Sequence, residues 1–483
     1  MRTPRRTAVA VASLLIATAC SAPVEPSSTT GGLVLPERFL ADASGAAGAT
    51  DADTRADLDL WWRRLGDDRL GEAVEEALRF NRELLAAAAR VDVARARAEL
   101  AGASLSPSLT ARLDAQRRRF NFIGLPIGGS DVFSVTTNQH TLALDLSWEL
   151  DLWGRVRAGE TAAEHDVEAA SADLRGAAHA IAGRTSKAWI ACVEAAQQLR
   201  LAEATAASRT RTEEMVRRRF TGGVRPALDL HLARADREAA EALVLVRQRA
   251  RDAAVRALQV LLGRYPGLAL DPGTSLPSAP PPVPAGLPAT LLRRRPDLAA
   301  AERRLAAADQ RVGEAKADRW PRVALTASGG TSSNDLTDLV DLDFRQWSLG
   351  ANLLAPIFDG GRRSTTIELR DAERRESEAR FAVLLLAALA EVEGALANAS
   401  TLAAEETSLA GAAAQARAAA TLSADRYARG LSDITTLLDA ERRALAADTA
   451  LLGVRRARLE NHIELLLALG GGIPPAAASD DRP

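Results

Sequence analysis

The sequence predicts a mainly α-helical protein with a small membrane β part, internally duplicated and built from long α-helical hairpins. The first observation is that residues 81–263 recur in altered form at residues 295–470. Three residues return displaced by 214 and two by 207: Leu84, Arg90 and Pro107 as Leu298, Arg304 and Pro321, and Gly154 and Gly223 as Gly361 and Gly430. The second observation is that each copy changes from helical to strand periodicity and back. Two repeats are too few for a stacked solenoid, so we expect each chain to be part of a larger ring.

The bulk composition favours long helices over a thick aromatic core. Aromatic residues make up only 4% of the 483 residues, while Ala, Leu, Arg and Glu dominate the helical stretches. The 61 basic and 63 acidic residues are mixed along the chain and give a net charge of -2. The sequence therefore offers no basic face, and we expect no nucleic-acid partner.

The N-terminus reads as an export signal over residues 1–19. Arginines precede an apolar run, residues 8–17, that is too short to cross a bilayer as a helix. Cleavage would leave Cys20 first, in a context similar to the lipobox of bacterial lipoproteins, although Ala17 stands where Leu is usual. The alternative is an ordinary signal-peptidase site with an incidental cysteine. Residues 20–60 read as a flexible tether, and Cys192, left without a disulfide partner, is expected to be a small buried apolar residue.

The first repeat is predicted to span residues 61–263. Apolar residues at three- and four-residue spacing predict a helix over residues 67–103, ended by Pro107. Alternation of apolar and polar residues then predicts two strands, at about 107–117 and 139–150, separated by a Gly-rich loop. The two repeat displacements differ by 7, and the length change falls in this loop.

The remaining helices of the first repeat predict a long and a short partner. No proline interrupts residues 155–221, which gives a helix of about 100 Å. After a turn at Gly222 and Gly223, a return helix to Leu262 is only about 55 Å long. The helix at 67–103 has a similar length, so we expect the two short helices to stack end to end and match the long one.

The second repeat, residues 289–470, is predicted to repeat this plan. Its strands are expected at about 321–330 and 346–356, around a loop at 331–345, and its helices at 295–319, 362–429 and 432–469. A proline-rich linker, residues 264–288, joins the repeats as a semi-rigid spacer. The tail, residues 471–483, is expected to be disordered.

The four strands have the length and alternation of transmembrane β-strands. A soluble sheet with one face on a core would show the same pattern, but Trp148, Trp153, Trp320 and Trp347 lie at or near strand ends, as at a membrane interface. Four strands cannot close a barrel, and an open edge in lipid leaves backbone groups unpaired. Two copies would give eight strands and little lumen, whereas three give a shared 12-stranded β-barrel with a pore. The helices would then form a trimeric α-barrel below it.

The chain resembles the TolC-like outer membrane factors, specifically the NodT-type lipoprotein branch that serves resistance-nodulation-division pumps. The segment Leu-Arg-Arg-Arg-Pro-Asp-Leu at 292–298, followed by Ala301-Glu302, Val312-Gly313 and Pro321, matches the most diagnostic segment of that branch. Trp61-Trp62 and Arg426-Tyr427 resemble other motifs of the family, and the matches extend from residue 61 to 469. Asp309 and Trp320 depart from its usual residues.

The resemblance implies an outer membrane homotrimer that acts as the passive exit duct of a tripartite efflux system, with lipid around its barrel. Its implied partners are a periplasmic adaptor protein, which docks on the hairpin tips, and an inner membrane resistance-nodulation-division pump. The tips in this chain lie at 220–225 and 427–432. We expect docking at the following residues: Gly222, Gly223, Val224, Arg429, Gly430 and Leu431. Gly223 and Gly430 are also explained as helix C-caps.

The resemblance also implies that Asp439 and Arg442 line the constricted periplasmic aperture and bond to neighbouring helices to hold it shut. Inward carboxylates, one per subunit, would repel anions and attract cations. The simpler alternative is an exposed i,i+3 helix pair worth about 0.2–0.5 kcal/mol.

Other function classes are less well supported. The five histidines are scattered, and the sequence holds no HExxH, no P-loop and no G-x-S-x-G elbow, so we expect neither catalysis, nor a metal, nor a cofactor. A periplasmic coiled-coil adaptor would not need four alternating strands. A type I protein-secretion duct remains an alternative within the channel class.

Overall fold

The computed structural model describes residues 39–40, 60–122, 133–267, 270, 273, 275–278 and 294–471. The predicted signal peptide, Cys20 with most of the tether, most of the proline-rich linker and the predicted tail beyond residue 471 lie outside the described residues.

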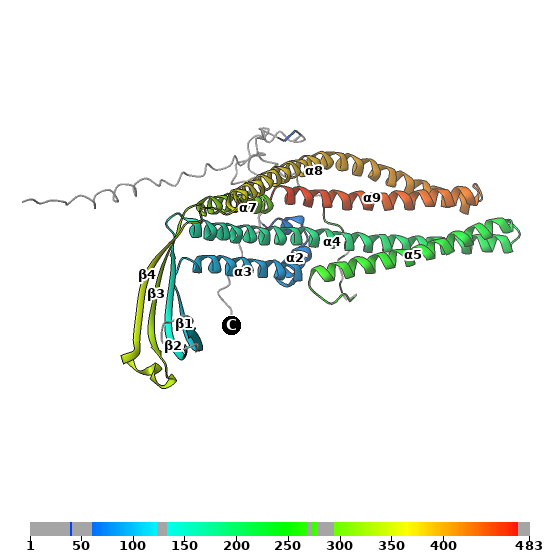
Figure 1. Cartoon of the computed structure of the whole chain (residues 1–483). Coiled ribbons are helices and arrows are strands. Elements are labelled where there is room, and N and C mark those ends of the chain that lie inside the picture. The colour runs from blue at the N-terminus through cyan, green and yellow to red at the C-terminus, as the bar shows by residue number, and fades with distance from the viewer. Residues whose placement is uncertain are drawn as a thin grey trace, which may run out of the picture.

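The described elements form two helical hairpins with a sheet at one end (Figure 1). The first repeat contains α2 (Asp68–Phe80), α3 (Arg82–Ala103), β1 (Ser108–Phe122), β2 (Phe133–Leu150), α4 (Arg155–Thr221) and α5 (Ala227–Leu261). The second contains α7 (Pro296–Ala317), β3 (Arg322–Ser333), β4 (Arg345–Leu354), α8 (Arg362–Ala428) and α9 (Ile434–Ala468). Corresponding helices have equal lengths: 67 residues in α4 and α8, 35 in α5 and α9, and 22 in α3 and α7. The predicted duplicated architecture is confirmed.

The predicted helix at 67–103 is wrong in one respect, because it is two helices broken at Asn81. Asn81 is extended, with φ -63° and ψ 128°, and its side chain accepts hydrogen bonds from the backbone N–H groups of Glu83 (2.9 Å) and Leu84 (3.3 Å). An asparagine side chain that caps a helix competes with continuation of the helix before it. The break also lets Asn81 Nδ2 donate to the carbonyl of Leu261 at the end of α5 (2.8 Å).

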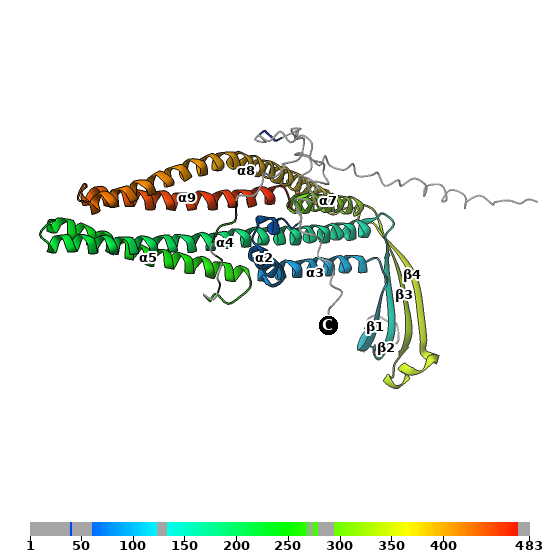
Figure 2. The ribbon, with the colours of Figure 1, turned by 180° about the vertical axis from the view of Figure 1, so that it is seen from behind.

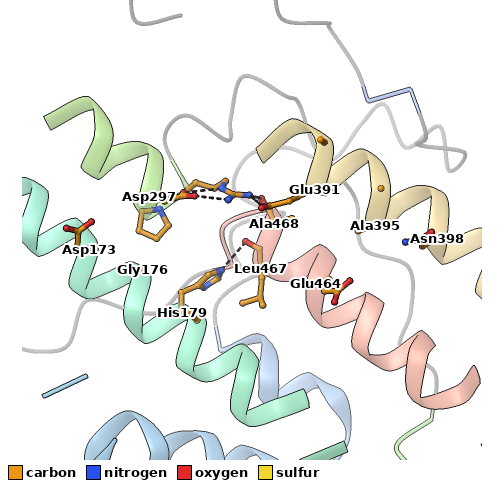
Figure 3. Close-up of a pocket in the computed structure, with 15 residues that line it drawn as sticks. Asp173, Gly176, His179, Asp297, Glu391, Ala395, Asn398, Glu464, Leu467 and Ala468 are labelled. Atoms are coloured by element: carbon orange, nitrogen blue, oxygen red, sulfur yellow. Dashed lines mark hydrogen bonds and ion pairs between the residues drawn. The ribbon is translucent and has the colours of Figure 1, made fainter. Parts of the chain in front are cut away.

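The helices form four neighbouring columns (Figures 1 and 2). Two columns are single long helices, α4 and α8, and the other two each consist of two short helices. In order across the chain, the columns are α3 with α5, then α4, then α7 with α9, then α8. Each short column consists of two helices that meet end to end, as predicted. In the first, Gly263 (φ +74°) leaves no room for a Cβ atom against the carbonyl of Phe80. In the second, the equivalent residue of Asn81, Arg295, donates to the carbonyl of Ala468 (3.3 Å), and Figure 3 shows this junction.

The largest fully buried side chains mark a core at the level of these junctions, mainly Trp61, Trp62, Leu70, Ile181, Ile190, Leu258, Leu262, Leu298 and Leu385. Cys192 belongs to this core as expected, and burial raises the pKa of its thiol to about 12. The thiol is therefore protonated and unreactive at neutral pH.

The four strands form one antiparallel sheet in the order β1-β2-β3-β4. β1 and β2 are longer than predicted because their pairing continues into residues that do not alternate, as far as Phe122 opposite Phe133. The loop of the second repeat is shorter than predicted. β3 runs on to Ser333, and the loop contains two short 3-10 helices, η3 (Leu336–Val340) and η4 (Leu342–Phe344).

The register gives the sheet one apolar and one polar face. On the polar face Asp145 accepts hydrogen bonds from Arg112 Nε (2.8 Å) and Ser328 Oγ (2.6 Å), which links three strands. The apolar face carries leucines such as Leu113 and Leu349, which are exposed in the single chain. One lipid-facing and one water-facing side is the pattern of a membrane barrel wall.

Candidate functional site at the hairpin tips

Both hairpins turn through a glycine in the left-handed conformation. Gly223 has φ +73° and Gly430 has φ +79°. The N–H of Val224 donates to the carbonyl of Arg219, and that of Leu431 to the carbonyl of Arg426, each at 2.9 Å. These bonds close the long helices as glycine C-caps, so this interpretation of the two glycines is correct.

The predicted docking residues lie together at the turns, far from the sheet (Figure 1). Val224 and Leu431 are equivalent in the two repeats and are 71% and 64% exposed. Arg429 forms an ion pair with Asp425 of its own helix (3.0 Å). Val224 and Leu431 thus place an exposed apolar side chain next to the glycine turn of each tip.

The two tips are joined by two arginines of the first tip that both contact one aromatic ring of the second. Tyr427 is fully buried, and its ring centre lies 5.2 Å from Arg219 Cζ and 5.3 Å from Arg225 Cζ. Arg219 also donates to the carbonyls of Tyr427 (2.7 Å) and Ala428, and Arg225 donates to that of Ser432 (3.0 Å). Cation–π contact and charge-assisted hydrogen bonds act together here. We call Arg219, Arg225 and Tyr427 the tip clamp.

Arg219 lies outside the predicted tip at 220–225, and Arg225 lies within it but was not predicted to make a contact. Arg219 ends a run of three arginines, a pattern that is usually a solvated helix end. The available signal was Tyr427, one of only two tyrosines in the chain.

Behind the tips, a charged cluster joins the two hairpins. Arg209 of α4 forms ion pairs with Asp236 of α5 (2.8 Å) and with Glu441 of α9. Arg442 of α9 donates to Asp236 Oδ1 from Nε (3.0 Å) and Nη2 (2.6 Å). The side chains of Arg209, Asp236 and Glu441 are only 4%, 8% and 14% exposed, whereas that of Arg442 is 63% exposed. We call these four residues the hairpin latch.

Asp439 and Arg442, which the family resemblance implies bond to neighbouring helices, differ in their partners. Asp439 forms its ion pair with Arg443 one helical turn along (2.8 Å), while Arg442 reaches across to the first hairpin. An i,i+4 pair on one helix is favourable for Asp439, and buried Asp236 offers Arg442 a less hydrated partner. The simpler alternative, an i,i+3 pair, is therefore wrong.

Arg209, Asp236 and Glu441 were not among the residues predicted from the sequence. They lie on three different helices, and only packing brings them together. One signal was present, because Arg209 sits midway between Ala202 and Val216 at seven-residue spacing, on the stripe that α4 buries. A charge on a buried stripe indicates a buried ion pair.

Paired helical hairpins are joined here to an amphipathic sheet in which, among the described residues, β1 and β4 each pair on one side only. These are the parts of a shared barrel. The profile of the family described as outer membrane efflux protein matches residues 73–264 and 287–471. The chain belongs to this family. Efflux channels of this family are passive exit ducts of tripartite pumps and not enzymes, and they lie in the bacterial outer membrane with a large periplasmic helical part.

Relatives and solved structures agree with this assignment. The chain is 32% identical to the outer membrane protein OprJ of Pseudomonas aeruginosa over 97% of both sequences. It is 30% identical to the pyoverdine export outer membrane protein OpmQ of Pseudomonas putida, over 94% of this chain and 95% of that one. The structure of the outer-membrane channel OprN superposes with a TM-score of 0.80 at 30% identity, over 91% of this chain and 99% of that one. The fold is that of the TolC-like trimeric channels with four strands per chain.

Proposed function

We propose that three copies of this efflux channel assemble into a homotrimer that passively conducts small molecules to the exterior. A periplasmic adaptor and an inner membrane resistance-nodulation-division pump supply the substrate. The observation that carries the proposal is the sheet. Within the described residues β1 pairs only with β2 and β4 only with β3, while one face is apolar and the other polar. A sheet of this kind reaches a stable state in lipid only when copies close it into a barrel.

The adaptor is proposed to dock on the two tips through Gly222, Gly223 and Val224 of the first hairpin and Arg429, Gly430 and Leu431 of the second. The exposed side chains of Val224 and Leu431, which are equivalent in the two repeats, support this. An exposed apolar side chain at each turn is unfavourable in water and favourable in contact with a partner protein. The tip clamp would hold Val224 and Leu431 at a fixed distance from each other.

We propose that the periplasmic aperture is held shut by Asp439 and Arg442, each through a different contact. Arg442 binds the first hairpin through Asp236, and Asp439 holds Arg443 on the exposed side of α9. Separation of the two hairpins of a protomer would break the bond of Arg442 and leave Asp236 with Arg209 alone. Salt would screen the exposed pair of Asp439 and Arg443 more than the bond of Arg442 to the buried Asp236.

The double variant Asp439→Ala with Arg442→Ala is expected to raise the single-channel conductance. It removes the hydrogen bonds from Arg442 to Asp236 and the Asp439 carboxylate of each subunit. The measurement is current through purified protein in planar bilayers. Arg417→Ala is a suitable control, since its ion pair with Asp448 joins α8 and α9 within one hairpin. Unchanged conductance in the double variant would remove Asp439 and Arg442 from the gate.

Cys20 is proposed as the lipid anchor. The support is a lipobox-like context and the placement of the chain in the outer membrane, where a lipidated N-terminus would sit. Intact mass measurement of the purified protein is expected to give a chain that begins at Cys20 and carries acyl groups. A mature chain that begins at Cys20 without acyl groups, or at Ser21, would contradict this.

A further inference from the structure

The apolar face of the sheet becomes basic near the loops that join its strands. On β1 every position of this face from Leu109 to residue 115 is apolar, and the next two positions are Arg117 and Arg119. On β4 the last apolar residue of this face is Trp347, and the next position is Arg345. Both edge strands of the sheet therefore change from apolar side chains to arginine at the same end.

The charges on this face have a single sign. On the four described strands it carries no Asp or Glu, and its arginines are Arg117, Arg119 and Arg345. All three are exposed, and no ion pair joins them to a described residue. The opposite face mixes both signs, as in the ion pair of Arg112 with Asp145. Unpaired positive charge next to an apolar surface indicates an anionic partner at a membrane.

These arginines lie at the outer surface of the membrane. The strands turn at the end of the sheet farthest from the helices, beyond Phe122 in the first repeat and at η3 and η4 in the second (Figure 1). Because the helical part is periplasmic, this end of the sheet lies in the outer leaflet. Trp347 is 81% exposed and directly precedes Arg345 on the apolar face, as expected at a membrane interface. The arginines are therefore at the level of the lipid headgroups, where a charge does not enter hydrocarbon.

The segment between β3 and β4 lies on the same face of the sheet. Thr331 Oγ1 donates to the carbonyl of Leu339 (2.5 Å), and Ser333 Oγ donates to Asp338 Oδ2 (2.9 Å). Thr331 is paired with Leu142, so both hydroxyl groups belong to the apolar face. We call residues 335–344 the outer flap. Its most exposed apolar side chains are Leu336 (62%), Val340 (85%) and Leu342 (69%). On a wall that faces lipid, such side chains contact acyl chains.

The outer flap leaves the arginines of β1 uncovered. The flap also carries the carboxylates Asp335, Asp338, Asp341 and Asp343. Asp338 accepts the hydrogen bond from Ser333, and Asp341 Oδ1 accepts one from the N–H of Asp343 (2.9 Å). The flap lies on β3, which is two strands from β1, a distance of about 10 Å. Arg117 and Arg119 are therefore separated from these carboxylates, whereas Arg345 adjoins them.

We propose that Arg117 and Arg119 bind the phosphate groups of lipid headgroups in the outer leaflet, while the outer flap contacts the acyl chains of the same lipid layer. Arginine presents parallel N–H donors that match a phosphate group. The two side chains leave one face of one strand about 7 Å apart, which suits neighbouring phosphate groups. Arg119 donates one bond from Nη2 to Ser134 Oγ (3.3 Å), which orients the guanidinium and leaves other donors free.

A lipid explains these observations better than a soluble anion does. The arginines continue an apolar face, and the outer flap exposes apolar side chains beside them, so the surface matches a molecule with a charged head and apolar chains. The site requires the apolar face to meet lipid, as in the proposed barrel, and it adds a partner on the outside of that barrel.

The test is binding of fluorescently labelled lipid A, a diphosphorylated glycolipid, to the purified full-length protein in detergent micelles. Arg117→Gln is expected to weaken binding about fivefold, and Arg117→Gln with Arg119→Gln about 25-fold, because each basic residue near an anionic surface contributes about fivefold. Dephosphorylated lipid A should bind the wild type as weakly as lipid A binds the double variant. Inorganic phosphate alone should not displace lipid A, because it lacks acyl chains.

Arg118→Gln is the matched control, because Arg118 lies between the two arginines but on the opposite face of the sheet. It should weaken binding by less than about twofold. Arg117→Lys with Arg119→Lys keeps both charges and should bind within about threefold of the wild type, which separates a loss of charge from a loss of folding. Equal weakening by Arg118→Gln, or unchanged binding in the double Gln variant, would overturn the lipid site.

The outer flap has a separate test. Val340→Ser with Leu342→Ser is expected to weaken the binding of phosphorylated and dephosphorylated lipid A alike, because contact with acyl chains does not depend on phosphate. An effect on neither lipid would remove the flap from the site.

Single-channel conductance in planar bilayers distinguishes failure of the lipid site from failure of the proposed function. The double Gln variant should conduct as the wild type does, since both arginines lie outside the lumen. Normal conductance with unchanged lipid binding would overturn the lipid site alone. A wild-type protein that forms no channel would instead contradict the proposed function.

Discussion

Arg209→Ala is expected to destabilise the channel by about 3 kcal/mol per chain, since it removes one partner of a buried ion pair. Arg209 is the central residue of the hairpin latch. Its loss leaves Glu441 without its described ion pair and leaves Asp236 with Arg442 alone. The remaining carboxylates are almost inaccessible to water, so solvent compensates little for the missing guanidinium.

The measurement is the shift of the unfolding midpoint of the purified protein in detergent. Arg211→Ala is the matched control, because Arg211 is exposed on the same helix and its loss should change stability by no more than about 0.5 kcal/mol. A double-mutant cycle with Glu441→Ala should give a coupling free energy of about 1 kcal/mol or more. Equal effects of Arg209→Ala and Arg211→Ala would show that the latch does not stabilise the fold.

Helix lengths could be predicted from the sequence, but a break within a helix could not. Helix lengths and repeat boundaries follow from periodicity and proline spacing, so α4 was predicted as residues 155–221 and forms there. The break at Asn81 was missed, because a capping side chain competes with a continuing apolar pattern that shows no interruption.

Partners of charged residues were the least predictable feature. Arg442 was expected to bond to a neighbouring helix, but no partner was named; it binds Asp236, 206 positions away. A helix offers several carboxylates at similar spacing, and the choice depends on which of them packing removes from water. The residues equivalent to Asp236 and Glu441 in the other repeat are Arg443 and Arg234. The charge at these positions is opposite in the two repeats, so a comparison of the repeats does not reveal the site.

Tyr427→Ala is expected to separate the two tips and to abolish efflux. Loss of a fully buried aromatic ring costs about 3–5 kcal/mol, and it removes the ring that Arg219 and Arg225 both contact. The cluster around Val216, Leu437 and Leu438 would lose its largest member. The core near Trp61 and Trp62 is a separate cluster, so the barrel should still assemble while the tips become mobile.

Tyr427→Phe separates the ring from its hydroxyl group. The hydroxyl oxygen is buried and has no hydrogen-bond partner among the described residues, so its removal should change stability by less than about 1 kcal/mol. We expect Tyr427→Phe to restore resistance to a deletion strain and Tyr427→Ala to leave that strain as sensitive as an empty vector does, with equal amounts of trimer in the outer membrane. Faster tryptic cleavage at the arginines of residues 217–219 in Tyr427→Ala would locate the defect at the tips. Wild-type resistance with Tyr427→Ala would mean that the adaptor does not need tips held at a fixed spacing.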